Sequence, residues 1–167
     1  IPIIFLKIMN LTQTKTSQKQ EYKEKIYEGA ITIFYKKMNQ ELLFLVVKNS
    51  KTENISFVSG AKENFDENVI KSAQRENKEE LDLDPEQYTL EKVEVKHEFI
   101  FDEKKKERAG KRGSYQVFVS DLTNADFDIK YTEELKSVKW MTEKDVLDSL
   151  SFLDLKEVFL NAVKNLK

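Results

Sequence analysis

Short runs rich in β-branched and aromatic residues recur along the chain, and this recurrence limits the fold to one built around a β-sheet. The first two runs, residues 30–35 and 42–47, flank the polar segment 36–41 and predict a β-hairpin. The other runs cover residues 55–58, 92–101, 114–120 and 136–141. We therefore expect six strands.

Two segments have the spacing of amphipathic helices. Between residues 67 and 81 the apolar side chains recur at i, i+1 and i+4, and we expect Asp84 and Pro85 to end this helix. Residues 154–166 carry a wide apolar face, and Thr142 before them has the side chain and spacing to cap a shorter helix. Strands and helices in this order predict an α+β fold with a mixed sheet between helices.

Composition limits both the size of the fold and its chemistry. A chain of 167 residues with 40% hydrophobic residues is enough for one domain with one core. It contains no Cys and one His, which excludes disulfides, zinc-thiolate sites and any multi-histidine metal site within one chain. The net charge of −2 is too close to zero for a general nucleic-acid coat. Any metal ion must therefore be held by carboxylates.

The N-terminal segment predicts neither an anchor nor a core element. Residues 1–6 are apolar, but they are far fewer than the ~20 that a membrane span needs. With no secretory pattern, we expect a cytoplasmic protein. Residues 10–27 suit a mobile arm or a short surface helix. Because Met9 opens this stretch, we interpret residues 1–8 as lying upstream of the natural start or as non-native, and we place the domain boundary between arm 1–27 and domain 28–167.

Three acidic residues share one face of the predicted helix. At 100° per residue, Glu79 lies about −60° and Glu80 about +40° from Glu76. Like charges at this spacing destabilise a helix by a few tenths of a kcal/mol each, so fold stability gives no reason to gather them. Binding of a hard cation such as Mg²⁺ or Mn²⁺ does give a reason to gather these acids. The alternative is an acidic face that is simply solvated.

The spacing around these acids resembles the Nudix box: G, five residues, E, seven residues, R-E, an apolar residue, any residue, E-E, any residue, G. Three positions depart from this pattern, namely Ala61 and Asp82 at the two glycines and Asn77 at the apolar position. In an alternative register, Gly60 is the box glycine and one residue is inserted. The positions that carry the match are Glu67, Arg75, Glu76, Glu79 and Glu80.

The resemblance covers roughly residues 28–165 and implies an α/β/α sandwich with Nudix hydrolase activity. It implies Mg²⁺ or Mn²⁺ bound by Glu76, Glu79, Glu80 and the Gly60 carbonyl, and attack of activated water on phosphorus of a diphosphate bridge. A box glutamate would be the general base, and we favour Glu79. Glu67 and Arg75 would pair with each other, since a guanidinium fork holds a carboxylate in one orientation.

Residues outside the box extend the predicted site. Glu134 stands six residues before Trp140, where Nudix enzymes that resemble diadenosine tetraphosphate hydrolases carry a ligand or base; it equally suits a solvated loop. Segment 102–112 holds six basic against three acidic residues, and we expect Lys104, Arg108 and Arg112 to bind substrate phosphates unless the segment is only a solvated hairpin tip. We assign no role to His97.

These patterns predict a pyrophosphohydrolase that acts on a nucleoside diphosphate derivative. The expected partner is a small nucleotide or polyphosphate, with no membrane, no stable nucleic-acid complex, and a monomeric or homodimeric state. Because Ala61 and Asp82 alter the box, the alternative is a catalytically weak Nudix-like module that senses nucleotide or RNA. A plain interaction domain with an incidental acidic helix is a third interpretation.

Overall fold

The computed structural model describes residues 24–166. Residues 1–23 and 167 lie outside the described part, and so do the expectations for residues 1–8 and for most of the arm. The first strand begins at Ile26, within the segment that the sequence assigned to that arm. In residues 24–166 no helix is long and apolar enough to cross a membrane.

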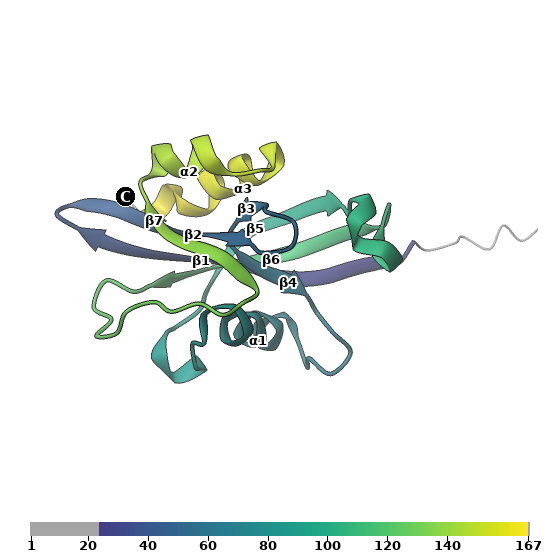
Figure 1. The fold of residues 1–167 in the computed structure, drawn as a ribbon, viewed down its shortest axis with the longest axis horizontal. Coiled ribbons are helices and arrows are strands. Elements are labelled where there is room, and N and C mark those ends of the chain that lie inside the picture. The colour runs from purple at the N-terminus through teal and green to yellow at the C-terminus, as the bar shows by residue number, and fades with distance from the viewer. Residues whose placement is uncertain (1–23, 167) are drawn as a thin grey trace, which may run out of the picture.

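A mixed sheet forms the centre of the molecule (Figure 1). Five of its strands run in the order β3-β2-β1-β6-β5, while β4 pairs with β1 and β7 pairs with β2. Only the β1–β6 ladder is parallel among the described strands; the other ladders are antiparallel. The strands are β1 (Ile26–Met38), β2 (Glu41–Asn49), β3 (Ile55–Ser56), β4 (Val58–Ala61), β5 (Glu91–Ile100), β6 (Arg112–Asp121) and β7 (Leu135–Met141).

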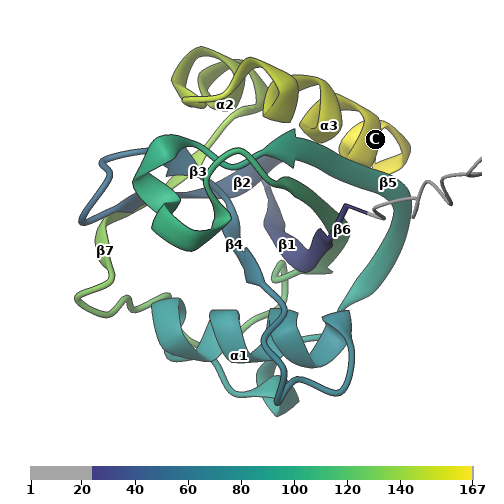
Figure 2. The ribbon, with the colours of Figure 1, turned by 90° about the vertical axis from the view of Figure 1, so that its right-hand side faces the viewer.

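Helices cover both faces of the sheet. One face carries α1 (Val69–Leu81), and the opposite face carries α2 (Glu143–Ser149) and α3 (Leu153–Val163) (Figure 2). Three short 3₁₀ segments complete the described part: η1 (Pro85–Gln87), η2 (Glu103–Arg108) and η3 (Lys164–Leu166). This arrangement confirms the predicted α+β class and the mixed sheet between helices.

The predicted hairpin is present and is formed by β1 and β2. Its turn consists of Asn39 and Gln40, with φ of 51° and 66°. Positive φ at both central residues is typical of the tight turns whose twist matches that of paired strands. The ladder closes at Met38 opposite Glu41.

The predicted strand over residues 55–58 is wrong in its extent. The segment forms two short strands, β3 and β4, which pair with different neighbours. β3 pairs with β2, whereas β4 crosses to the first half of β1, where Gly60 lies opposite Ala30. This change of partner brings the end of β4 against α1 and so positions the candidate site.

The core has a layer on each face of the sheet. On the α3 side, Phe159 lies between Phe44 and Phe57, with ring centroids 4.9 and 5.5 Å away. On the α1 side, Phe34 and Leu81 are fully buried and belong to a second cluster. Both helix layers are therefore held by apolar packing, which fixes their positions relative to the sheet.

Candidate active site

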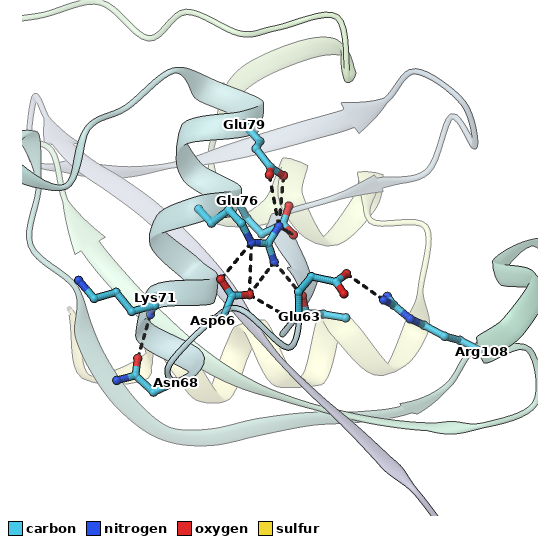
Figure 3. A network of polar contacts seen from close by, with 9 residues as sticks. Glu63, Asp66, Asn68, Lys71, Glu76, Glu79 and Arg108 are labelled. Carbon is cyan, nitrogen blue, oxygen red and sulfur yellow. Dashed lines mark hydrogen bonds and ion pairs between the residues drawn. The ribbon is translucent and has the colours of Figure 1, made fainter.

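Arg75 of α1 ties the helix to the loop before it, and its partners Asp66, Glu76 and Glu79 are labelled in Figure 3. Its Nε and Nη2 atoms donate to the carboxylate of Asp66 at 2.9–3.2 Å, and Nη2 also donates to the carbonyl of Ala61 at 3.0 Å. Asp66 is buried and accepts a further hydrogen bond from the backbone N–H of Glu63. The predicted pair of Arg75 with Glu67 is wrong, because Glu67 points to solvent and Asp66 takes its place.

This contact favours the alternative register of the box. Asp66 stands six residues after Gly60, the separation that the box requires between its first glycine and its first acid. One residue is then inserted before Arg75. In this register Gly60, not Ala61, occupies the glycine position, and Ala61 is no longer a departure.

The other two departures occupy well-defined positions. Asn77 is fully buried, and its side-chain N–H donates to Thr32 Oγ1 at 3.3 Å and Tyr88 Oη at 3.2 Å. Asp82 caps the C-terminus of α1 with φ 54°, a left-handed conformation that glycine adopts most easily. Both residues preserve the local geometry with a different side chain.

The three glutamates of α1 differ in their surroundings. Glu76 accepts a hydrogen bond from Nη1 of Arg75 at 2.9 Å, and the more exposed Glu79 lies 3.3 Å from the same atom. Glu80 is 8% exposed, and its Oε2 atom is buried with no hydrogen-bond partner among residues 24–166. Burial of an ionised carboxylate without a partner is costly, so a cation or a proton bound at Glu80 would lower the free energy.

The electrostatics of the cluster raise two pKa values. Burial, together with the charges of Glu79 and Glu134, raises the pKa of Glu76 to about 7, although Arg75 acts in the opposite direction. Burial and the charges of Glu76, Glu134 and Glu79 raise the pKa of Glu80 to about 9. Since Glu134 acts on both groups, the structure brings it close to the acids of α1, from a loop more than fifty residues away.

Gly60 is required by the close approach of α1 to β4. A Cβ atom at this position would overlap the carboxylate of Glu76. Gly60, whose carbonyl is the predicted metal ligand, lines the same cavity as Glu76.

The donors match a hard divalent cation in their chemistry. Carboxylates and a backbone carbonyl are the ligands that Mg²⁺ and Mn²⁺ prefer, and the unpartnered Oε2 of Glu80 is an atom that such an ion would satisfy. Within residues 24–166, however, no group of three or more acidic, His or Cys side chains is gathered closely enough to hold an ion. Arg75 holds Glu76 and Glu79 instead.

A cavity of about 430 Å³ adjoins these carboxylates. Glu76 and Glu80 line it from α1, while Asp154 and Leu155 line it from α3. It therefore reaches from one helix layer to the other. Its apolar wall includes Phe99 of β5.

The basic residues predicted to bind substrate lie at different places. Arg108 lines the cavity, forms an ion pair with Glu63 at 3.0 Å and lies over the rings of Tyr27 and Phe101. Arg112 is exposed at the start of β6 and is not part of the described cavity wall. Lys104 belongs to η2, but its side chain lies outside the described part. Lys105, which the sequence did not single out, does line the cavity.

Sequence reasoning missed two further pairs of the cavity wall. Glu63 pairs with Arg108, and His97 pairs with Asp154 at 2.9 Å. The partners are 45 and 57 residues apart, so no local spacing could reveal them. The single histidine, flanked by strand residues, was the one signal available for the second pair.

The fold and the site together define an α+β domain in which the acidic helix α1 and the neighbouring strand β4 contribute to a cavity lined by carboxylates. The profile of the NUDIX domain matches residues 27–161, and the chain belongs to this family. Its members are hydrolases that act on pyrophosphate bonds. No curated protein sequence shows a significant match.

Solved structures share the fold at low sequence identity. A Caenorhabditis elegans Ap4A hydrolase binary complex superimposes with a TM-score of 0.69 at 20% identity, covering 84% of this chain and 96% of that one. The Escherichia coli dihydroneopterin triphosphate pyrophosphohydrolase superimposes with a TM-score of 0.68 at 20% identity, covering 84% of this chain and 95% of that one. The NUDIX domain of Shewanella oneidensis NrtR, complexed with ADP ribose, superimposes with a TM-score of 0.65 at 15% identity, covering 86% of this chain and 89% of that one.

Proposed function

We propose that this protein hydrolyses a phosphoanhydride bond in a nucleoside diphosphate derivative, with Mg²⁺ or Mn²⁺ as cofactor. The observation that carries the proposal is a pair of carboxylates, the buried Glu80 and the largely buried Glu76, at the wall of a cavity of about 430 Å³. A protein gains no stability from burying acids whose pKa values are raised to about 7 and about 9. Perturbed acids in a cavity are typical of functional sites.

The ion would be held by Glu76, Glu79, Glu80 and the carbonyl of Gly60. When bound, it would supply the positive charge that neutralises substrate phosphate and makes a water molecule acidic enough to attack phosphorus. Glu79, the most exposed of the three acids, is our choice as the general base that takes the proton, and Glu134 is the second candidate. Asp66 fixes the guanidinium of Arg75, which in turn orients Glu76 and Glu79.

Substrate phosphates would also meet positive charge from η2, whose Lys105 acts electrostatically on Glu80. Arg108 and Lys105 line the cavity from η2, and a guanidinium can bind two phosphate oxygens at once. Arg112 and Lys104 add charge to the same segment and remain candidates for longer-range attraction of a polyphosphate. The cytoplasmic location and the monomeric or dimeric state remain predictions.

Hydrolysis of a nucleotide panel tests the proposal. The purified protein is incubated with Mg²⁺ or Mn²⁺ and with nucleoside di- and triphosphates, dinucleoside polyphosphates and nucleotide sugars, and released phosphate, pyrophosphate and nucleotide are measured. We expect metal-dependent turnover that Glu79→Gln lowers by 10²-fold or more. The matched control is Glu67→Gln, which removes an exposed acid outside the Arg75 network. Full activity of Glu79→Gln would reject this assignment of the base.

Thermal unfolding tests the cofactor separately from turnover. An ion that binds only the folded protein raises its melting temperature by mass action. We expect Mn²⁺ to raise the melting temperature of the wild type and to raise that of Glu80→Gln much less. An equal rise in both proteins would place the ion elsewhere.

One observation favours the alternative of a weakly catalytic, nucleotide-sensing module. In the described residues Arg75 holds Glu76 and Glu79, and no three acids are gathered for an ion. Nucleotide binding without turnover of any compound in the panel, under either metal, would support that alternative.

A further inference from the structure

The His97–Asp154 pair is a polar feature of the cavity that the proposed chemistry does not use. His97 lies on β5 and Asp154 in the first turn of α3, so the pair joins the sheet to the helix layer opposite α1. His97 Nε2 lies 2.9 Å from Asp154 Oδ2, and both residues line the cavity. The His97 side chain is 10% exposed, whereas the Asp154 side chain is 53% exposed.

The imidazole is held in a fixed orientation. Its ring stacks on Phe99 with a centroid distance of 4.7 Å and an interplanar angle of 24°. Phe99 in turn meets Phe101 and Tyr115 edge to face, and it lies across Gly113, where a Cβ atom would overlap its ring. The aromatic support and the carboxylate therefore fix both the plane and the rotation of His97.

The carboxylate also decides which nitrogen carries the proton. An ionised carboxylate can only accept hydrogen bonds, so Nε2 of the neutral imidazole must be the N–H donor to Asp154. Nδ1 is then left as a bare acceptor, and none of the described residues donates to it. A neutral imidazole in this state has one free hydrogen-bond acceptor and no free donor, and the residue lines the cavity.

Some of the other polar side chains that line the cavity already make hydrogen bonds. Asn49 Oδ1 accepts from the backbone N–H groups of Lys51 and Thr52. Thr52 Oγ1 accepts from Asn54, and Ser56 Oγ donates to the carbonyl of Phe57. His97 adds the acceptor Nδ1 to a part of the wall that also contains the rings of Phe99 and Tyr115.

We infer that His97 selects substrates whose planar ring carries an amino group, because Nδ1 accepts a hydrogen bond from that group, and that Asp154 is the positioning residue that holds the proton of the neutral imidazole on Nε2. The inference rests on the proposed function for its orientation: phosphates lie toward the carboxylates of α1 and the ring lies toward α3. Aminopurines and other amino-substituted heterocycles belong to this class, whereas hypoxanthine, which carries no amino group, does not.

Nuclear magnetic resonance can follow this imidazole directly, because the chain contains a single histidine. Protein labelled with ¹⁵N in histidine is titrated with AMP, GMP and IMP in the presence of Mg²⁺, at a pH at which the spectrum shows a neutral ring. These monophosphates contain no phosphoanhydride bond, so they are not turned over. We expect the free protein to show a protonated Nε2 and a bare Nδ1.

The expected result is a shift of the Nδ1 resonance on addition of AMP or GMP, with at least one of them binding about five- to tenfold more tightly than IMP. That ratio is what one hydrogen bond contributes. Equal binding of all three nucleotides, no binding of any, or an unmoved Nδ1 resonance would overturn the inference.

Two variants distinguish recognition of the amino group from a purely structural role of the His97–Asp154 pair. His97→Phe keeps a ring against Phe99 but has no acceptor, so the preference over IMP should disappear while the affinity for IMP stays within about twofold. Asp154→Ala should show a mixture of imidazole tautomers and a reduced preference. The control is Glu157→Ala, which removes an exposed acid from the same helix. A loss of thermal stability in His97→Phe and Asp154→Ala with an unchanged preference would show that the pair is structural only.

The two proposals fail in different experiments. Turnover in the nucleotide panel without any preference for amino-substituted rings would overturn only the role of His97. Selective binding of AMP or GMP without turnover of any panel compound would overturn only the proposed hydrolysis.

Discussion

Asp66 and Glu67 are neighbours in the chain, but only Asp66 reaches Arg75. Asp66 is buried and receives the guanidinium at 2.9–3.2 Å, whereas Glu67 is exposed. The turn between β4 and α1 decides this, because the backbone N–H of Glu63 donates to Asp66 and draws that carboxylate inward. Spacing alone could not distinguish two adjacent acids in a loop.

We predict that Asp66→Asn lowers the free energy of unfolding by about 2–3 kcal/mol, because it leaves the guanidinium of Arg75 partly buried without its main counter-charge. Glu67→Gln should change it by less than about 0.5 kcal/mol, as is usual for exposed positions. Urea denaturation of the two variants and the wild type measures both effects. A larger loss for Glu67→Gln would restore the pairing expected from the box spacing.

The pH dependence of the same variants tests the cause. Although burial opposes it, hydrogen bonds from Arg75 and from the Glu63 backbone, with the charge of Arg75, hold the pKa of Asp66 below its usual value. The stabilisation is therefore complete above the unfolded pKa of about 3.9 and is lost as the pH falls through the folded pKa. The stability difference between wild type and Asp66→Asn should shrink over that acidic range and stay constant near neutrality.

Gly60 carries the second prediction at this scale. Because a Cβ atom there overlaps Glu76, Gly60→Ala should displace that carboxylate and lower kcat/KM by about 10²-fold, the cost of a misplacement of about 1 Å. Ala61→Gly, at the position that the first register assigns to the box glycine, should retain activity within about twofold. Steady-state kinetics on the best panel substrate compare them, and the reverse ranking would support the register that begins at Ala61.

Among the secondary-structure elements, α1 ends at a residue that its sequence does not predict as a helix end. Asp82 adopts φ 54° and its backbone N–H bonds to the carbonyls of Asn77 and Lys78. The sequence led us to expect that Asp84 and Pro85 end the helix, but these residues only begin η1. The stop is a left-handed cap, formed by an acid where the Nudix box has glycine.

We predict that Asp82→Gly is more stable than Asp82→Ala by about 1 kcal/mol, since glycine adopts this conformation without a steric penalty. Both variants lose the contact of Asp82 with Lys78, so their comparison isolates the backbone effect. Thermal denaturation measures the difference. Equal stability would mean that α1 ends elsewhere in solution.

The strands were largely predictable from composition, and their partners were not. The runs at 92–101 and 114–120 correspond to β5 and β6 within two residues at each end, because β-branched and aromatic residues favour extended backbone locally. The division of residues 55–58 into β3 and β4 depends on β1, whose first half pairs with β4 and whose second half pairs with β2. A local pattern contains no information on such a change of neighbour.

At the scale of the whole molecule, α3 is held to the sheet by its buried aromatic residue. We predict that Phe159→Ala lowers the free energy of unfolding by about 3–5 kcal/mol, because it leaves a cavity between Phe44 and Phe57. Leu160→Ala, one residue further on and 41% exposed, should cost less than about 1 kcal/mol. Urea denaturation compares the two, and similar losses would contradict the packing described here.

The cavity is a property of the whole fold. Its wall combines residues of all seven strands, α1, η2 and α3, which lie up to 124 residues apart in the sequence, from Ile31 to Leu155. The acidic residues that α1 contributes were predictable, because Glu76 and Glu80 lie on one face of a single helix. The basic part was predictable only as a charged segment, and the structure selects Arg108 and Lys105 from it as cavity residues.

The sequence by itself determined the class of fold, the two amphipathic helices and the spacing of the α1 carboxylates, because each depends on periodicities that extend over a few residues of one element. The tertiary structure alone decided that Asp66 binds Arg75, that Glu63 reaches Arg108 and that His97 meets Asp154. Each of these contacts joins a loop or strand to another part of the chain, and its partner is set by how the helix layers pack on the sheet.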